Sequence, residues 1–145
     1  MGSWRKSTQF GGDGGSPFSD DLTNVKRLAG FYIRHGSRID AIQGIYEYSD
    51  GRRTPQGFHG GYGGSHNIVF FENDEYIIQI TGRTDRRVDQ LTFTTNKRTY
   101  GPYGGDGGNP FEIDAAHISG FFGRSASELD AIGFFIPTVH HHHHH

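Results

Sequence analysis

Three aspartates occupy the same local setting in this chain. Each one follows an aliphatic residue and opens a short apolar stretch, in Ile39-Asp40-Ala41-Ile42, Val88-Asp89-Gln90-Leu91 and Leu129-Asp130-Ala131-Ile132. An ionised carboxylate only accepts hydrogen bonds, and its two oxygens together can accept from two neighbouring hydroxyl groups. A single aspartate of this kind most often caps a turn by bonding its own backbone. Three in register instead predict up to three places that bind a hydroxyl-rich ligand such as a sugar.

A Gly-Gly-X-Gly-Gly loop recurs with the aspartates, at residues 11–15, 60–64 and 104–108. Turns that need positive φ would account for one or two glycines in each loop, but not for both pairs in all three. A loop without Cβ atoms lets a ligand approach the main chain and its N–H donors. A phosphate cradle is excluded, because no Gly-Lys-Ser/Thr follows and no helix is expected there.

The paired threefold repeat predicts one domain made of three similar units. No stretch has a helical pattern, and the apolar residues favour strands. Short strands with frequent turns are typical of an all-β sandwich, barrel or prism. The repeat period of about 41–49 residues has room for four strands. We therefore expect an all-β fold of three four-stranded antiparallel sheets about a pseudo-threefold axis. The principal predicted strands cover 30–35, 39–48, 67–71, 75–82, 88–94, 111–113, 117–122 and 129–136.

Composition excludes several classes of function. The formal net charge is −2 and no basic block is present, so nucleic acid is not an expected partner. No apolar stretch is long enough to enter and cross a membrane. Cysteine is absent, which excludes disulfides and thiolate metal sites. The histidines outside the terminal run show no metal-ligand spacing, so no metal or cofactor is predicted. No apolar leader is visible, and both a cytoplasmic location and secretion remain open.

Several motifs in order resemble those of the jacalin-related lectin family. They are Gly11 to Phe18, Thr95-Asn96-Lys97, Tyr100-Gly101-Pro102, Gly120-Phe121-Phe122-Gly123-Arg124-Ser125 and Leu129-Asp130-Ala131-Ile132-Gly133. The resemblance implies a β-prism I fold over residues 10–137, after an N-terminal extension at 1–9 and before a purification tag at 140–145. It also implies binding of mannose-type sugars, or of galactose in one branch, without metal and without catalysis. The galactose branch is cleaved to free a glycine amine, and nothing here suggests such a cut, so mannose or glucose is favoured.

Carried over by position, the resemblance implies three carbohydrate sites, each joining the last glycine of a loop to four residues that end in an aspartate. These are Gly15 with Ser127, Glu128, Leu129 and Asp130; Gly64 with Ser37, Arg38, Ile39 and Asp40; and Gly108 with Arg86, Arg87, Val88 and Asp89. The family pattern Gly-X-X-X-Asp is kept at Gly36, whereas Ala126 and Asp85 replace the glycine in the other two units. Asp85 places a second carboxylate near Asp89.

Two other functions are weighed against the lectin. A glycoside hydrolase needs two carboxylates ~5–10 Å apart with different roles, and here each repeat supplies one. A prism-fold scaffold for protein interaction, with weakened sugar binding, is consistent with the changes at Asp85 and Ala126. Arg83, Arg86 and Arg87 are expected on a solvated face. The predicted partners are mannose-containing glycans or glycoproteins, with a homodimer or a higher homo-oligomer as the expected assembly.

Overall fold

The computed structural model describes residues 3–138, and all regular structure in that range is β-strand. The predicted tag at 140–145 lies outside the described residues. The strands are β1 (Trp4–Lys6), β2 (Phe10–Gly11), β3 (Ser16–Ser19), β4 (Val25–His35), β5 (Ile39–Tyr48), β6 (Arg53–Pro55), β7 (His59–Gly60), β8 (Ser65–Phe70), β9 (Ile77–Thr84), β10 (Val88–Thr95), β11 (Thr99–Gly104), β12 (Asn109–Asp114), β13 (Gly120–Ser125) and β14 (Leu129–Pro137). Residues 3–138 contain no helix of the length and apolarity needed to span a membrane.

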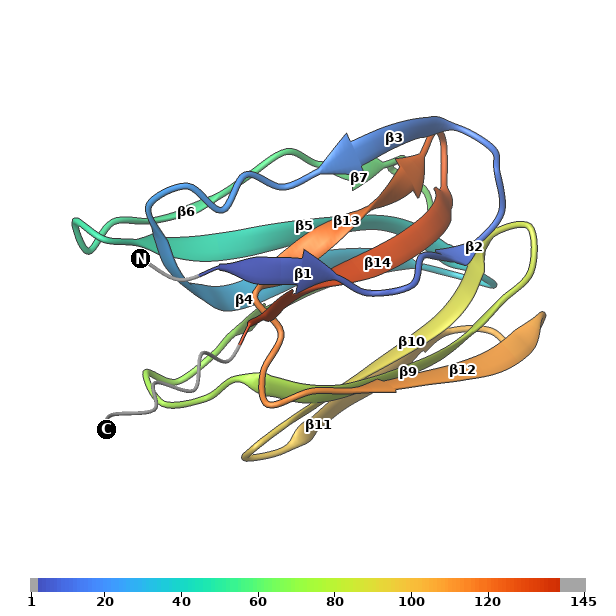
Figure 1. Cartoon of the computed structure of the whole chain (residues 1–145). Coiled ribbons are helices and arrows are strands. Elements are labelled where there is room, and N and C mark those ends of the chain that lie inside the picture. Colours follow the sequence, from blue (N-terminus) through green and yellow to red (C-terminus); the bar gives the residue numbers. More distant parts are fainter. Residues whose placement is uncertain (1–2, 139–145) are drawn as a thin grey trace.

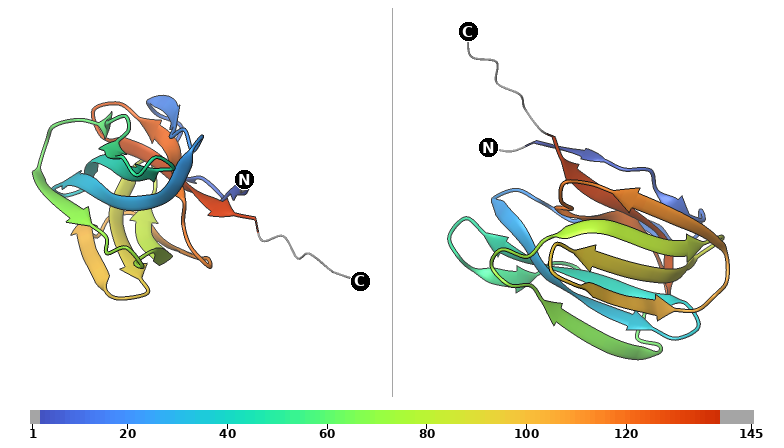
Figure 2. Two further views of the ribbon diagram at one scale, coloured as in Figure 1. Left: turned by 90° about the vertical axis from the view of Figure 1, so that its left-hand side faces the viewer. Right: turned by 90° about the horizontal axis from the view of Figure 1, so that it is seen from below.

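The strands form three antiparallel sheets around one core (Figures 1 and 2). A central hairpin lies in each: β13 with β14 in the first sheet, β4 with β5 in the second, and β9 with β10 in the third. Outer strands flank each hairpin, giving the orders β1-β14-β13-β3, β6-β5-β4-β8 and β11-β10-β9-β12. The all-β prediction of three antiparallel sheets is therefore confirmed.

The fourth strand of a sheet is divided in two of the three units. Both β1 and β2 pair with β14, and both β6 and β7 pair with β5. In the third sheet β11 is continuous, but its register with β10 shifts between Leu91 and Phe93. Each sheet thus keeps four strand positions, and the extra strands are the two halves of an interrupted outer one.

The predicted strand boundaries agree with the structure for some buried strands and are shifted for others. β4 begins at Val25, although its strand was predicted only from residue 30. The predicted strand at 39–48 coincides with β5, and 88–94 falls within β10. The strands predicted at 75–82 and 117–122 begin too early, because β9 starts at Ile77 and β13 at Gly120. β1, β2 and β3 were not predicted, since these edge strands are largely exposed and lack apolar alternation.

Phenylalanines from all three sheets meet in the core. The ring of Phe93 on β10 lies 4.4 Å from that of Phe31 on β4 and 6.4 Å from that of Phe121 on β13. Phe121 in turn makes an edge contact with Phe134. All four side chains are fully buried. Burial of such rings supplies much of the apolar stabilisation of a domain this size, and it closes the three sheets against one another.

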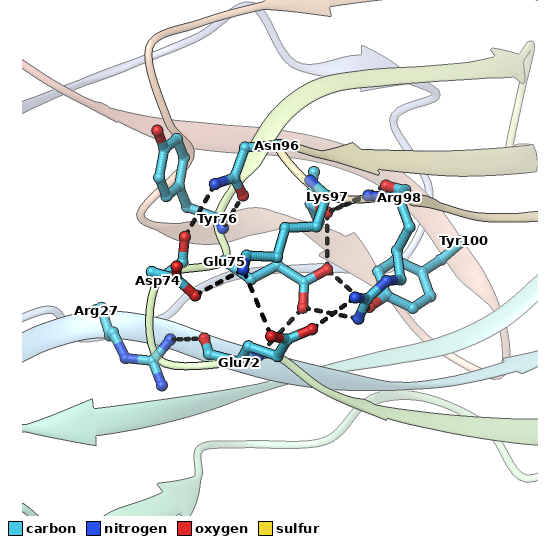
Figure 3. Close-up of polar contacts among 10 residues, drawn as sticks. Arg27, Glu72, Asp74, Glu75, Tyr76, Asn96, Lys97, Arg98 and Tyr100 are labelled. Atoms are coloured by element: carbon cyan, nitrogen blue, oxygen red, sulfur yellow. Dashed lines mark hydrogen bonds and ion pairs between the residues drawn. The ribbon is translucent and has the colours of Figure 1, made fainter.

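A buried carboxylate anchors the third sheet at the end of β9 and β10 opposite their connecting turn (Figure 3). Glu75 Oε1 accepts from the backbone N–H of Glu72 at 3.1 Å and lies 3.3 Å from Arg98 Nη1. Its Oε2 accepts from the hydroxyls of Thr95 at 2.7 Å and Tyr100 at 2.8 Å. Burial acts to raise the pKa of Glu75, but these hydrogen bonds outweigh it and hold the pKa below its usual value.

We predict that Glu75→Gln lowers the free energy of unfolding by about 3 kcal/mol at neutral pH. All four partners donate to the carboxylate. In the glutamine variant an NH₂ group replaces one of the two oxygens, so it faces donors instead of accepting from them, and the negative charge is also lost. Because the folded-state pKa of Glu75 is depressed, its contribution is fully present above the unfolded-state pKa and disappears as the pH falls through the folded value. Urea unfolding at neutral and acidic pH measures both effects.

The exposed Glu112→Gln variant is the control and is expected to unfold as the wild type does. Equal stability of Glu75→Gln and the wild type at neutral pH would contradict the structural role assigned to this carboxylate.

Candidate functional site

Each of the three aspartate carboxylates lies against the second glycine pair of one loop. A Cβ added at Gly14 would lie 2.5 Å from Asp130 Oδ2, and one at Gly15 would lie 2.7 Å from Oδ1. The same relation holds between Asp40 and Gly63–Gly64, and between Asp89 and Gly107–Gly108, with corresponding distances of 2.7–2.8 Å. The structure therefore brings together the glycine and the aspartate of each predicted site. All three lie at one end of the prism, where the hairpin turns gather (Figure 1).

The first glycine pair of each loop serves a different contact. A Cβ at Gly12 would overlap the carbonyl oxygen of Arg86, which belongs to the aspartate turn of another sheet. Gly61 meets the carbonyl of Ser127 in the same way, and Gly105 meets that of Ser37. The glycine before each of these, at Gly11, Gly60 and Gly104, instead meets the backbone carbonyl of the loop's own aspartate. Each loop thus approaches its own aspartate with three glycines and the turn of another unit with the fourth. The three contacts between units close a ring, and together these approaches explain why both glycine pairs recur.

Three arginines donate hydrogen bonds to the backbone carbonyls of the glycine loops. The Nη2 atoms of Arg34, Arg83 and Arg124 donate to the carbonyls of Gly64, Gly108 and Gly15 at 2.8–2.9 Å. Their Nε atoms donate to the carbonyl of the preceding glycine. Sequence analysis missed this role and placed Arg83 on a solvated face. The signal was available, because each arginine stands six residues before its aspartate.

The residue two positions before each aspartate points toward the other sites. Arg38 donates to both oxygens of Glu128, from Nε to Oε1 at 2.7 Å and from Nη2 to Oε2 at 3.2 Å. Arg87 Nη1 lies 3.5 Å from Glu128 Oε2, and its Nε lies 3.5 Å from Asp130 Oδ2. We call Arg38, Arg87 and Glu128 the axial triad. The hydrogen bonding from Arg38 lowers the pKa of Glu128 below its usual value.

Of the remaining predicted residues, Ser37, Arg86 and Ser127 are exposed, and Arg86 lines a pocket beside Asp89 and Asp130. Ile39, Val88 and Leu129 are fully buried in the core, so only their backbones face the site. An open pocket of about 610 Å³ lies between Asp89 and Asp130. Glycines of the loops at 11–15 and 104–108 contribute to its lining.

The three carboxylates have different surroundings. Burial raises the pKa of Asp40, and the charge of Glu128 adds to this effect. Burial also raises the pKa of Asp89; Arg38 opposes the rise, and the predicted neighbour Asp85 adds to it. Asp130 is only 4% exposed, and its Oδ1 is one of two buried side-chain polar atoms within residues 3–138 that have no hydrogen-bond partner. A buried acceptor without a partner is rare in folded proteins, so this oxygen marks Asp130 as different from the fully bonded Glu75.

The departures from the glycine pattern fit the backbone. Asn24 is the one non-glycine residue with positive φ in the part of the chain that the structure describes, so Asp85 and Ala126 are not strained. A Cβ at Gly36 would meet Asp40 Oδ2 at 3.8 Å, which is an ordinary contact. A side chain at this position is therefore tolerated. Within residues 3–138 no group of three or more histidine, aspartate or glutamate side chains is placed to hold a metal ion.

Residues 7–135 match the profile of the Jacalin-like lectin domain. The chain belongs to this family. It is therefore a carbohydrate-binding lectin with a β-prism fold, and the predicted family is confirmed. Because the relatives are lectins, the glycan-processing enzyme is not supported.

Two sequence relatives and one solved structure show how far this jacalin-type lectin resembles known members. It is 34% identical over 136 residues to horcolin from Hordeum vulgare, covering 88% of this chain and 92% of horcolin. Griffithsin from a Griffithsia species is 33% identical over 131 residues, covering 88% and 93%. The structure of AcmJRL, a mannose-binding jacalin-related lectin from Ananas comosus, matches with a TM-score of 0.85 and 36% identity, covering 92% of this lectin and 96% of that chain.

We predict that Gly64→Ala destabilises the lectin by about 2 kcal/mol, whereas Gly36→Ala changes the free energy of unfolding by less than about 0.5 kcal/mol. Gly64 has φ of +72° and no room for a Cβ, while Gly36 has neither restriction. Thermal unfolding of both variants measures the difference. Equal stability of the two would show that the loop does not depend on the missing Cβ.

Proposed function

We propose that this lectin binds mannose- or glucose-type glycans at up to three sites, centred on Asp40, Asp89 and Asp130, without a metal ion. The observation that carries the proposal is the same in each site: a carboxylate lies directly against a glycine main chain that has no side chains to block a ligand. AcmJRL, which is named as mannose binding, is similar over nearly the whole chain. Mannose-containing glycans and glycoproteins are the proposed partners.

The proposed contact uses the two oxygens of each carboxylate. Two adjacent hydroxyls of a pyranose donate to Oδ1 and Oδ2, and backbone N–H groups of the preceding turn donate to ring and hydroxyl oxygens. Hydrogen bonds to a charged acceptor are stronger than neutral ones, and they are short when the geometry is good. The arginine behind each glycine loop binds the loop's carbonyls, so it preserves the shape of the loop before the sugar arrives.

The sites are not proposed to be equally strong. Arg87 Nε lies 3.5 Å from Asp130 Oδ2, so a hydroxyl that reaches this oxygen must displace the guanidinium or share the carboxylate with it. One shallow sugar site has a dissociation constant near the millimolar range, which corresponds to ~4 kcal/mol. Useful affinity then comes from several sites that engage one branched glycan, or from a homo-oligomer.

We predict that Asp40→Asn, Asp89→Asn and Asp130→Asn each weaken binding to a mannose-rich glycan, and that the triple variant loses it. Each change removes the charge and replaces one acceptor oxygen by a donor, at a cost of about tenfold or more in affinity at that site. Calorimetric titration with mannose and a glycan array competed by free mannose measure the loss. Circular dichroism and thermal unfolding check that the variants remain folded.

The control is the same titration in EDTA, which is expected to leave binding unchanged. Wild-type affinity in the triple variant would refute the site assignment, and loss of binding in EDTA would refute the metal-free mechanism. If the wild type binds no glycan but binds a protein, the scaffold function replaces this one.

We also predict that acid weakens sugar binding at a pH above the ordinary aspartate pKa. Burial raises the pKa of Asp40 and Asp89, so these carboxylates take up a proton and lose an acceptor earlier on acidification than an exposed aspartate does. Asp85→Asn is expected to lower the pKa of Asp89, since it removes a neighbouring negative charge. NMR titration of the carboxyl resonances measures the pKa values of Asp40 and Asp89 in the wild type and the pKa of Asp89 in the variant. An Asp89 titration that does not change in the variant would contradict the coupling.

A further inference from the structure

One glycine loop differs from the other two in its middle residue. Loop 60–64 has Tyr62 at this position, whereas the other loops have Asp13 and Asp106. The side chain of Tyr62 is 78% exposed, more than any other large apolar side chain within residues 3–138. An aromatic ring left so open, in a loop that faces a binding site, is a candidate for ligand contact.

Tyr62 is held in place although it is exposed. Its ring stacks on Phe58 with centroids 4.6 Å apart and planes 9° from parallel. Phe58 packs against Tyr32, whose ring stacks on His66 at 5.6 Å. We call Tyr62, Phe58, Tyr32 and His66 the aromatic column. One face of the Tyr62 ring is covered by the column, and the ring does not have to be ordered again when a ligand arrives.

The aromatic column is tied to the Asp40 site by one side chain. Arg34 Nη1 donates to the hydroxyl of Tyr32 at 2.8 Å. The same guanidinium donates to the carbonyls of Gly63 and Gly64, the glycine pair that lies against the carboxylate of Asp40. Tyr62 itself directly precedes this pair. Arg34 therefore holds both the aromatic column and the glycine pair that lies against the carboxylate of Asp40 on β5.

Pyranose rings suit such a surface. Their hydroxyls lie around the rim, and their faces present C–H groups whose partial positive charge is attracted to the negative face of an aromatic ring. When a sugar is held at Asp40 by its hydroxyls, its glycosidic linkage leads to the next sugar unit of the chain. The C–H face of that second sugar unit is best met by an apolar surface. Asp13 and Asp106 in the other loops do not offer one.

We propose that Tyr62, supported by Phe58, forms a second subsite beside Asp40 and takes the face of the adjacent pyranose in a mannose-type oligosaccharide. This inference rests on the proposed function of the Asp40 site. It makes that site selective for disaccharides and longer glycans, whereas the Asp89 and Asp130 sites bind single residues. The repeat thus contains one site for an extended chain and two for terminal sugars.

The test compares mannose with an α-linked mannobiose in a variant that keeps the Asp40 site alone, Asp89→Asn combined with Asp130→Asn. In that background, Tyr62→Ala is expected to reduce the ratio of mannobiose to mannose affinity about three- to tenfold and to leave mannose affinity within about twofold. Tyr62→Phe is expected to retain the ratio, because it keeps the ring. Tyr76→Ala, which removes an exposed tyrosine at the other end of the third sheet, is the matched control and is expected to have no effect.

The wild-type protein supplies a second measurement that needs no substitution. Ring resonances of Tyr62 are expected to shift and to transfer saturation to mannobiose, and to respond much less to mannose. An unchanged affinity ratio in Tyr62→Ala, or an equal loss in Tyr62→Phe, overturns the subsite while mannose binding leaves the proposed function intact. Failure of the wild type to bind mannose at all overturns the proposed function instead, and the subsite with it.

Discussion

The close approach of glycine main chain to carboxylates and carbonyls is the contact on which this structure depends. In each loop three glycines leave no room for a Cβ beside their own aspartate, and the fourth leaves none beside the turn of another sheet. The ring of contacts so formed joins the three sheets at one end of the prism. The same absence of side chains opens the main chain to a ligand. The residues that join the sheets are therefore the same ones that form the proposed binding surface.

The two ends of the prism show two ways to place a buried carboxylate: Glu75 lies beside the third sheet and Asp130 on β14 of the first. The carboxylate of Glu75 accepts from backbone, hydroxyl and guanidinium donors, and these hydrogen bonds hold its pKa below the usual value. Asp130, at the other end of the prism, has a buried oxygen without a partner in the described range. A carboxylate with all its acceptors bonded stabilises a fold, whereas a buried oxygen without a partner costs stability.

The threefold repeat of the backbone is broken by side chains. The axial triad pairs Arg38 with Glu128 and brings Arg87 against Asp130, so the three positions carry two cations and one anion. Asp85 adds a charge beside Asp89, and Tyr62, stacked on Phe58, adds an exposed ring to the glycine loop of the Asp40 unit. The three repeated positions therefore share a backbone and differ in the charge and shape of their surroundings.

The sequence alone determined the local parts of this protein. The recurring glycine loops and aspartates predicted three units. The apolar pattern predicted β5 and most of β10, because the burial of a strand is visible in the spacing of its own apolar residues. The exposed edge strands β1, β2 and β3 have no such pattern and were missed. Only the tertiary structure decided which loop meets which turn, why each loop needs two glycine pairs, and that Arg38, Arg87 and Glu128 meet between the sites. These contacts join residues far apart along the chain, and their geometry is set by the closure of three sheets around one core rather than by any short segment.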